Sequence, residues 1–243
     1  MPEIHEINYT VRPYEAGYGK TLKPEALLNY LQDAAFEHSY RRGISLYHFV
    51  PLGLTWVLTR YHVEVERDPA VGERVTVRTW YPGAVKPYYL RDWEIVDSEG
   101  ITLVRATSSW LIIDMKRKGP SGDNGLLDGF PPHPVRSLED DFAPLPEMES
   151  VDAESTFCVR LSDTDLNRHV NHVHYIQWAL DSVPAEVMDK KLVTGIEVGY
   201  RGEARFGDKV ISKVGSGGEG LFLHQLVRES DGKELTRLRT KWG

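Results

Sequence analysis

Residues 161–175, LSDTDLNRHVNHVHY, hold three histidines, two asparagines and two aspartates. Imidazole, amide and carboxylate groups gathered in this way can ligate a metal, activate water or cap a helix. The metal interpretation is the weakest, because His169, His172 and His174 lack the i, i+4 spacing of a helical zinc pair and no cysteine stands among them. We therefore expect neither a metal nor another cofactor.

Helix capping explains part of this cluster. Val173 and Ile176 belong to an apolar stripe with helical spacing, so a helix is predicted to begin near them. Asp163, Asp165 or Asn167 precedes that helix, and such side chains accept hydrogen bonds from free first-turn amides. For each of these three residues taken alone, capping is the simpler prediction.

The chain contains two copies of one pattern, and repeats of this kind bear directly on the fold. These segments recur in the same order: Tyr9–Arg12 as Phe157–Arg160, Leu27–Asp33 as Tyr175–Asp181, Gly72–Val75 as Gly207–Val210, and Leu103, Arg105 and Trp110 as Leu235, Arg237 and Trp242. Between the copies, residues 116–155 are rich in Pro, Gly and acidic residues, so they are predicted to be a surface linker.

Each copy reads as one strand, one helix and then several strands. In the first copy, Pro24 opens a helix with one apolar face. Runs rich in β-branched and aromatic residues follow at 54–66, 73–81, 88–96 and 101–114, and in the second copy at 191–201, 208–214, 221–227 and 234–242. The sequence predicts an α+β fold with domains at 1–115 and 156–243, each a helix laid on a curved antiparallel sheet.

The repeat also separates function from folding in the cluster. At the repeat's offset the first copy has residues without acid–base groups: Gly17, Gly19 and Thr21 stand opposite Asp165, Asn167 and His169. The first copy is expected to make the same turn without these groups, so the fold does not require them. We infer that the second copy carries out a reaction and the first binds.

A motif in the second copy runs from Asp165 to Tyr175, DLNRHVNHVHY, and is followed by Trp178 and by GYRGE, which ends at Glu203. This motif resembles that of the acyl-acyl-carrier-protein thioesterases, which release fatty acids from fatty-acid synthesis. Residues 91–93 and 105–110 are similar to that family's first half, so the resemblance covers nearly the whole chain except the linker. It implies tandem hotdog domains, each a long helix wrapped by an antiparallel sheet. It also implies a set of catalytic residues: Asp165, Asn167, His169 and Glu203.

Thioester hydrolysis needs a positioned water, a base and donors for the developing oxyanion. In the implied scheme Glu203 and His169 orient and deprotonate the water, Asn167 positions it or contacts the substrate, and Asp165 orients Asn167 or His169. Backbone amides at the helix start polarise the carbonyl. Direct attack by Asp165 is less favoured.

A cysteine nucleophile is not expected. Plant members of the family often have cysteine after the glutamate, and here that residue is Ala204. The single cysteine, Cys158, lies outside the motif in a predicted strand and is expected to be a small buried residue.

The acyl chain needs an apolar site, and the first copy is its natural host. Five residues are predicted to bind it: Leu31, Ala34 and Ala35 on the helix, and Trp56 and Trp93 on strands. For each of them, a plain core role is equally compatible with the sequence. The resemblance implies acyl carrier protein as the partner, and because this carrier is acidic it should dock on a basic patch. Candidates are 41–42, 116–118 and 190–191.

The bulk composition excludes several classes. A net charge of -7 argues against a general nucleic-acid binder. One cysteine excludes an internal disulfide, and the chain has neither a signal peptide pattern nor a run of about 20 apolar residues. We expect a cytoplasmic protein that does not enter membranes. Because two fused hotdogs already form a pair, a monomer or a homodimer is expected.

Three alternatives remain open at this point: a hotdog thioesterase acting on acyl-coenzyme A, a hotdog dehydratase that leaves the thioester intact, and a non-catalytic acyl-binding module.

Overall fold

The computed structural model describes residues 3–17, 19–122, 125–127 and 129–243. The chain forms two compact units, residues 1–142 and 143–243, so the division falls inside the segment predicted as the linker. Among the described residues, no helix is long and apolar enough to cross a membrane.

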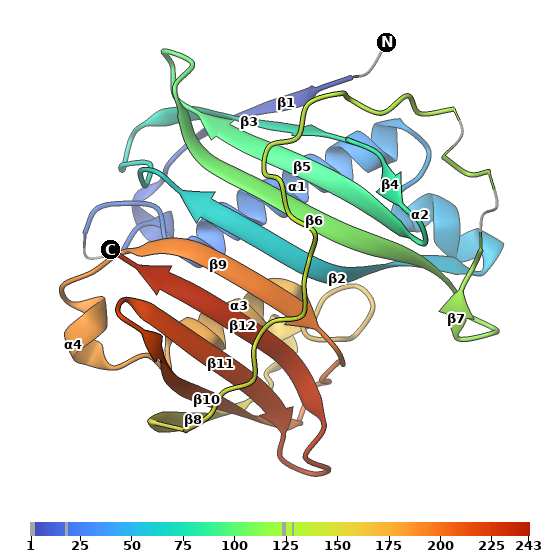
Figure 1. The fold of residues 1–243 in the computed structure, drawn as a ribbon. Helices are drawn as coiled ribbons and strands as arrows, with labels where there is room; N and C mark the ends of the chain where they lie inside the picture. Colours follow the sequence, from blue (N-terminus) through green and yellow to red (C-terminus); the bar gives the residue numbers. More distant parts are fainter. Residues whose placement is uncertain (1–2, 18, 123–124, 128) are drawn as a thin grey trace. The chain divides into compact units, whose positions relative to one another are not determined.

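The first unit is an antiparallel sheet with one long helix (Figure 1). Its main elements are β1 (His5–Thr10), α1 (Pro24–Arg41), β2 (Leu54–Val65), β3 (Arg74–Trp80), β5 (Tyr88–Val96) and β6 (Thr102–Asp114), in the sheet order β1-β3-β5-β6-β2. The short α2 (Leu46–Phe49), β4 (Ala84–Val85) and β7 (Gly119–Pro120) complete it. The predicted helix after Pro24 and all four predicted strands are confirmed.

Helix α1 packs on one face of this sheet through its apolar residues. Leu28, Leu31 and Ala34 have no exposed surface, as their helical spacing predicts. Trp93 of β5 is also buried, and its indole Nε1 donates a hydrogen bond to the Leu31 carbonyl at 2.8 Å. The same tryptophan therefore fills the core and ties the sheet to the helix.

The second unit repeats this arrangement. Its elements are β8 (Ala153–Cys158), α3 (His172–Leu180), α4 (Ala185–Met188), β9 (Val193–Tyr200), β10 (Lys209–Gly218), β11 (Leu221–Arg228) and β12 (Glu234–Trp242). The sheet order β8-β10-β11-β12-β9 matches that of the first unit, strand for strand. The predicted tandem hotdog fold is confirmed, although α3 has 9 residues where α1 has 18.

The duplication extends to strand register. Tyr9 pairs with Val75 in the first unit, and Phe157, its counterpart in the repeat, pairs with Val210 in the second. Both pairs are those that the sequence repeat aligns. The repeat read from the sequence therefore reports a real structural duplication.

The same strand positions also carry an aromatic contact to the helix in each unit. Tyr9 stacks on Tyr30 of α1, with ring centroids 4.2 Å apart. Phe157 stacks on Trp178 of α3 at 5.6 Å. Offset stacking of this kind adds to the burial that fixes each helix on its sheet.

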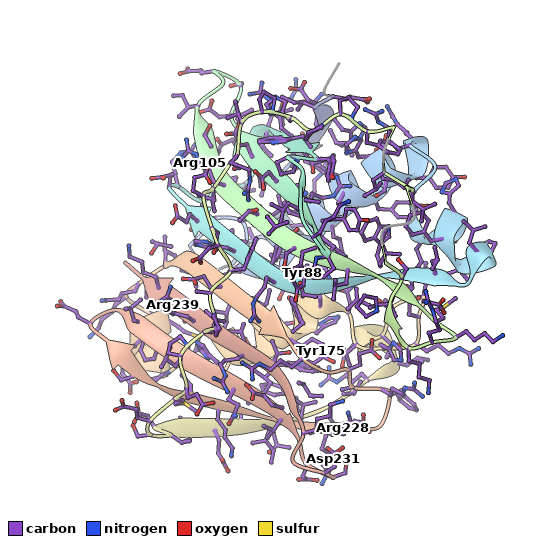
Figure 2. The ribbon with its side chains drawn as sticks, turned by 45° about the vertical axis from the view of Figure 1, so that its right-hand side comes forward. Tyr88, Arg105, Tyr175, Arg228, Asp231 and Arg239 are labelled. Atoms are coloured by element: carbon purple, nitrogen blue, oxygen red, sulfur yellow. The ribbon has the colours of Figure 1, made fainter. Side chains whose placement is uncertain are left out.

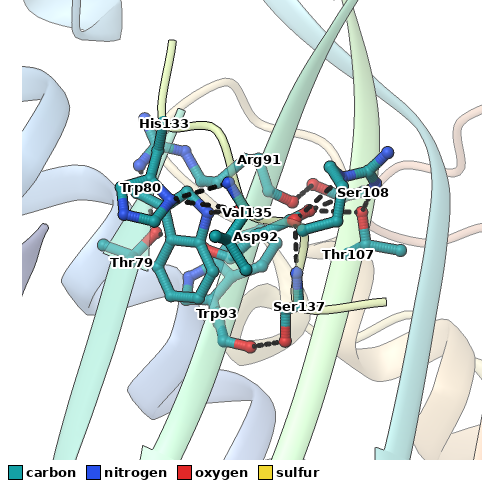
Figure 3. A network of polar contacts seen from close by, with 11 residues as sticks. Thr79, Trp80, Arg91, Asp92, Trp93, Thr107, Ser108, His133, Val135 and Ser137 are labelled. Atoms are coloured by element: carbon teal, nitrogen blue, oxygen red, sulfur yellow. Dashed lines mark hydrogen bonds and ion pairs between the residues drawn. The ribbon is translucent and has the colours of Figure 1, made fainter. Parts of the chain in front are cut away.

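Part of the predicted linker is bound to the first unit by a buried carboxylate. Residues 133–140, which we call the strap, are held to the first unit from His133, whose amide donates to the Tyr81 carbonyl at 2.8 Å, to Asp140, whose carboxylate lies 2.7 Å from His62 Nδ1. Figure 3 shows the part around His133, Val135 and Ser137. Asp92 of β5 has no exposed surface and accepts hydrogen bonds from Arg136 Nε at 2.9 Å, Thr107 Oγ1 at 2.6 Å and Ser137 N at 2.8 Å. Because side chains alternate along a strand and Trp93 faces α1, Asp92 lies on the opposite face of the sheet. The strap is thus an ordered cover of that face.

The prediction for Cys158 is wrong. Its side chain is exposed at the end of β8. Neighbouring residues of a strand point to opposite faces, and Phe157 takes the inner face to stack on Trp178. Cys158 must therefore point outward.

Candidate active site

The site loop is a closed turn that precedes α3. The Asp165 amide donates to the His169 carbonyl at 2.8 Å, and the Arg168 amide donates to the Asp165 carbonyl at 3.0 Å. Arg168 has a φ of 61°, in the left-handed region. The Asp165 carboxylate accepts a hydrogen bond from the Asn167 amide at 2.8 Å, so Asp165 shapes the loop that carries Asn167.

Helix capping falls to a residue that the sequence did not single out. Asn171 is the N-cap of α3, and its side chain accepts a hydrogen bond from the Val173 amide at 3.1 Å. Asp163 instead accepts from the Arg160 amide in the preceding 3₁₀ turn, Leu161–Asp163. The prediction that Asp163, Asp165 or Asn167 caps this helix is wrong, because the closed turn separates them from it.

A second segment brings a carboxylate to this loop. The Val170 amide donates to the Ala204 carbonyl at 2.9 Å, which places residues 203–205 beside the loop. His169 Nδ1 then lies 3.3 Å from Glu203 Oε2. The imidazole is 25% exposed and the carboxylate 59% exposed, so the pair is open to water. A carboxylate at this distance can orient an imidazole and fix its tautomer.

The four residues named by the resemblance do not all touch. His169 and Glu203 lie 3.3 Å apart. Asp165 and Asn167 are joined by a hydrogen bond from the Asn167 backbone amide to the Asp165 carboxylate. Among the described residues, no side-chain hydrogen bond joins Asp165 or Asn167 to His169 or Glu203. The Asn167 side chain is exposed and therefore available to a bound molecule.

In the first unit the same backbone hydrogen bonds form without these groups, as the repeat predicts. The Gly17 amide donates to the Thr21 carbonyl at 3.0 Å, and Lys20, the counterpart of Arg168, has a φ of 59°. The Leu22 amide donates to the Pro69 carbonyl at 2.8 Å, as Val170 does to Ala204. The backbone thus forms with glycine and threonine where the second unit has Asp165, Asn167 and His169.

A further histidine lies next to the loop. Burial, with a smaller contribution from nearby His174, lowers the pKa of His172 to about 4. His172 is the first residue of α3, and its carbonyl accepts a hydrogen bond from the Tyr200 hydroxyl at 3.3 Å. At neutral pH this imidazole is uncharged, which distinguishes it from a cationic substrate anchor.

The predicted acyl-binding residues fall into two groups in the first unit. Leu31, Ala34 and Ala35 lie on the buried face of α1, next to Trp93. Trp56 belongs to a separate aromatic group near α2, where it stacks on Phe49 with ring centroids 5.4 Å apart and meets Tyr89 and Trp110 edge-on.

In the part of the chain that the structure describes, no group of three or more His, Cys, Asp and Glu side chains is arranged so that it could hold a metal ion. The thiol of Cys158 lies on β8 outside the loop. Ala204 follows Glu203, and its methyl group is fully buried. The groups that the loop itself presents are carboxylate, amide and imidazole.

Family comparison agrees with this arrangement over both units. Residues 2–122 match the acyl-ACP thioesterase N-terminal domain, and residues 147–243 match the acyl-ACP thioesterase C-terminal domain. The chain belongs to the acyl-ACP thioesterase family. The unmatched residues between the two domains include the strap.

Individual relatives support the same family. The chain is 33% identical to a palmitoyl-acyl carrier protein thioesterase of Cuphea hookeriana, over 97% of this chain and 61% of that protein. It is 32% identical to oleoyl-acyl carrier protein thioesterase 1 of Arabidopsis thaliana, over 96% of this chain and 74% of that protein. It thus spans less than two thirds of the Cuphea protein's length.

The fold matches a solved structure along its whole length. An acyl-ACP thioesterase from Bacteroides thetaiotaomicron superposes with a TM-score of 0.90 at 24% identity, and the match covers 99% of this chain and 98% of that one. This likeness establishes the tandem fold.

Proposed function

We propose that this protein hydrolyses the thioester bond of acyl-acyl carrier protein and releases a free fatty acid. The observation that carries the proposal is the His169–Glu203 pair, 3.3 Å apart. At the matching positions the first unit has Thr21 and Asp68, so it keeps the backbone hydrogen bonds and a carboxylate but has no imidazole. Relatives named as thioesterases of palmitoyl- and oleoyl-acyl carrier protein support the substrate class.

In the mechanism that we favour, Glu203 and His169 orient one water molecule and remove its proton as it attacks the thioester carbonyl. The Asp165 carboxylate stabilises the loop by accepting a hydrogen bond from the backbone amide of Asn167. The exposed Asn167 side chain then positions the water or donates to the oxygen that becomes negative.

Helix α3 contributes fewer oxyanion donors than the sequence suggests. The Val173 amide is bonded to the Asn171 side chain, and the His174 amide to the Asn171 carbonyl. Two first-turn amides are therefore already in use. This favours Asn167 over the helix start as the donor to the developing oxyanion.

Attack by a protein nucleophile is less favoured. Position 204 offers a buried methyl group, and the Asp165 carboxylate already accepts a loop hydrogen bond. A mechanism through water requires neither a thiol nor an anhydride.

We assign the acyl chain to the first unit and the reaction to the second. Leu31, Ala34, Ala35 and Trp93 are buried apolar side chains of the first unit, and the bond from the Trp93 indole to the Leu31 carbonyl places Trp93 beside α1. Buried apolar side chains at this helix are what an acyl-chain site would use. Trp56 stands in a partly exposed aromatic group, and such side chains also suit an apolar ligand.

The carrier protein is proposed to bind through a basic patch. Arg41, Arg42 and Arg117 are paired with Glu37, Glu3 and Asp114. Lys116, Lys118, Lys190 and Lys191 are exposed and have no ion pair among the described residues, so the basic groups at 116–118 and 190–191 are the preferred candidates. A monomeric or homodimeric state and a cytoplasmic location stay predictions, and the plant relatives are named as chloroplastic.

The first experiment measures free-thiol release from acyl-carrier-protein and acyl-coenzyme A thioesters of short to long chains. We expect release from the carrier-protein substrates, and its chain-length dependence gives the specificity. If coenzyme A substrates release thiol as fast as the carrier-protein substrates, the protein does not need the carrier protein, and the acyl-coenzyme A thioesterase alternative is favoured. Alkene formation without thiol would identify a dehydratase. Binding of acyl carrier protein without any release would leave a recognition module.

A further inference from the structure

A buried hydroxyl group holds the backbone beside Glu203. The Tyr175 side chain projects from α3, and its hydroxyl oxygen accepts a hydrogen bond from the Ala204 amide at 2.7 Å. Tyr175 is 3% exposed and Ala204 has no exposed surface, so no water competes for this bond. The bond joins the helix that follows the site loop to the segment that carries Glu203.

The same short segment is fixed at two further points. The Ala204 carbonyl accepts from the Val170 amide at 2.9 Å, and the Glu203 carbonyl accepts from Arg228 Nη2 at 3.0 Å. Figure 2 marks Tyr175 and Arg228 in the second unit. The Glu203 side chain is mostly exposed, so packing does little to place it. Its position opposite His169 therefore depends on how firmly its backbone is held.

The first unit shows that folding does not require the tyrosine bond. At the repeat's offsets, Leu27 replaces Tyr175 and Pro69 replaces Ala204. Leucine has no hydroxyl group and proline has no amide hydrogen, so donor and acceptor are both missing there. The neighbouring bond is kept, since the Leu22 amide still donates to the Pro69 carbonyl. The tyrosine bond is present only in the unit that carries the imidazole–carboxylate pair.

We propose that Tyr175 is a positioning residue that holds Glu203 opposite His169. This inference rests on the proposed thioesterase function. Burial raises the pKa of Tyr175 to about 12, so the side chain is a neutral phenol at neutral pH. Its effect on the reaction passes through the Ala204 amide, and it does not itself meet the substrate.

The test is Tyr175→Phe, which removes the hydroxyl and keeps the ring against Trp178 and Tyr200. We expect kcat to fall about 10–100-fold, because a small misplacement of a catalytic group is costly, with KM within about twofold of wild type. The pH–rate profile should also shift, since the coupling of Glu203 to His169 weakens. Tyr30→Phe removes a hydroxyl from the corresponding helix of the first unit and should change neither kcat nor the profile.

A double-substitution cycle separates positioning from a structural role. On a Glu203→Gln background, Tyr175→Phe should cause little further loss, because both act on one step. Ala204→Pro reproduces the first unit's residue and should give the same profile as Tyr175→Phe. If the wild type is active, two results would overturn the positioning role. One is an unchanged kcat and pH profile in Tyr175→Phe, and the other is full additivity of Tyr175→Phe with Glu203→Gln. Absence of thiol release by the wild type would instead overturn the proposed function.

Discussion

Thr21 and His169 occupy the same backbone position in the two units of this chain. Each carbonyl accepts a hydrogen bond from the amide four residues earlier, from Gly17 in the first unit and Asp165 in the second. The chain therefore contains its own reference loop. Substitutions in the site can be compared with changes at the matching positions of the first unit, which have the same backbone hydrogen bonds and lack the imidazole.

The first prediction concerns the imidazole–carboxylate pair. His169→Ala and Glu203→Ala should each lower kcat/KM about 10²–10⁴-fold, the usual contribution of general-base catalysis. Their matched controls are Thr21→Ala and Asp68→Ala, because Asp68 precedes Pro69 as Glu203 precedes Ala204. The controls should retain most of the activity. Thiol release measures both sets, and largely intact activity in both site variants would exclude the proposed mechanism.

The second prediction concerns the acyl-chain site. Ala34→Leu or Ala35→Leu should shift release toward shorter chains, because added volume on the buried face of α1 shortens the space for the chain. Overpacking should also cost about 1–3 kcal/mol of stability. Ala179→Leu, on the buried face of α3, is the control that should destabilise without changing the product profile. Chromatography of the released acids decides, and an unchanged profile in both α1 variants would remove these alanines from the site.

The third prediction concerns the strap. Asp92→Ala leaves Arg136, which is only 17% exposed, without its carboxylate partner. Breaking a buried pair in this way costs about 3–5 kcal/mol. Arg117→Ala breaks an exposed pair with Asp114 and should cost no more than about 1 kcal/mol. Denaturant unfolding measures both, and limited proteolysis near Ser137 should be faster in Asp92→Ala only. Equal stability of the two variants would contradict the conclusion that the Asp92–Arg136 pair holds the strap on the sheet.

The fourth prediction concerns acid stability. Burial lowers the pKa of His224 to about 3, below the unfolded value of 6.5. Between these two pH values His224 is protonated in the unfolded chain and neutral in the folded chain. The free energy of unfolding therefore falls as the pH falls from 6.5 toward 3. His224→Leu should reduce this slope by about 1.4 kcal/mol per pH unit. Unfolding free energies at several pH values test this, and parallel curves for wild type and variant would show that His224 does not titrate as expected.

The sequence determined the secondary structure and the duplication. Periodic apolar residues report which face of a helix or strand is buried, and this is a local property, so α1 and the main strands could be predicted. Because the two copies align residue by residue, the same register and the same loop could also be expected in both units. The resemblance to the family named His169 and Glu203 together, although nothing in their local patterns joins them.

Only the tertiary structure decided which distant groups meet. Glu203 reaches His169 because the Val170 amide bonds to the Ala204 carbonyl, and the Tyr175 bond to the same residue depends on how α3 lies on its sheet. The buried hydrogen bond between Asp92 and Arg136 binds part of the predicted linker, the strap, to the sheet of the first unit. The physical reason is common to all three. Periodicity states that a residue is buried, but its partner is set by strand register and by backbone hydrogen bonds between segments far apart in the chain.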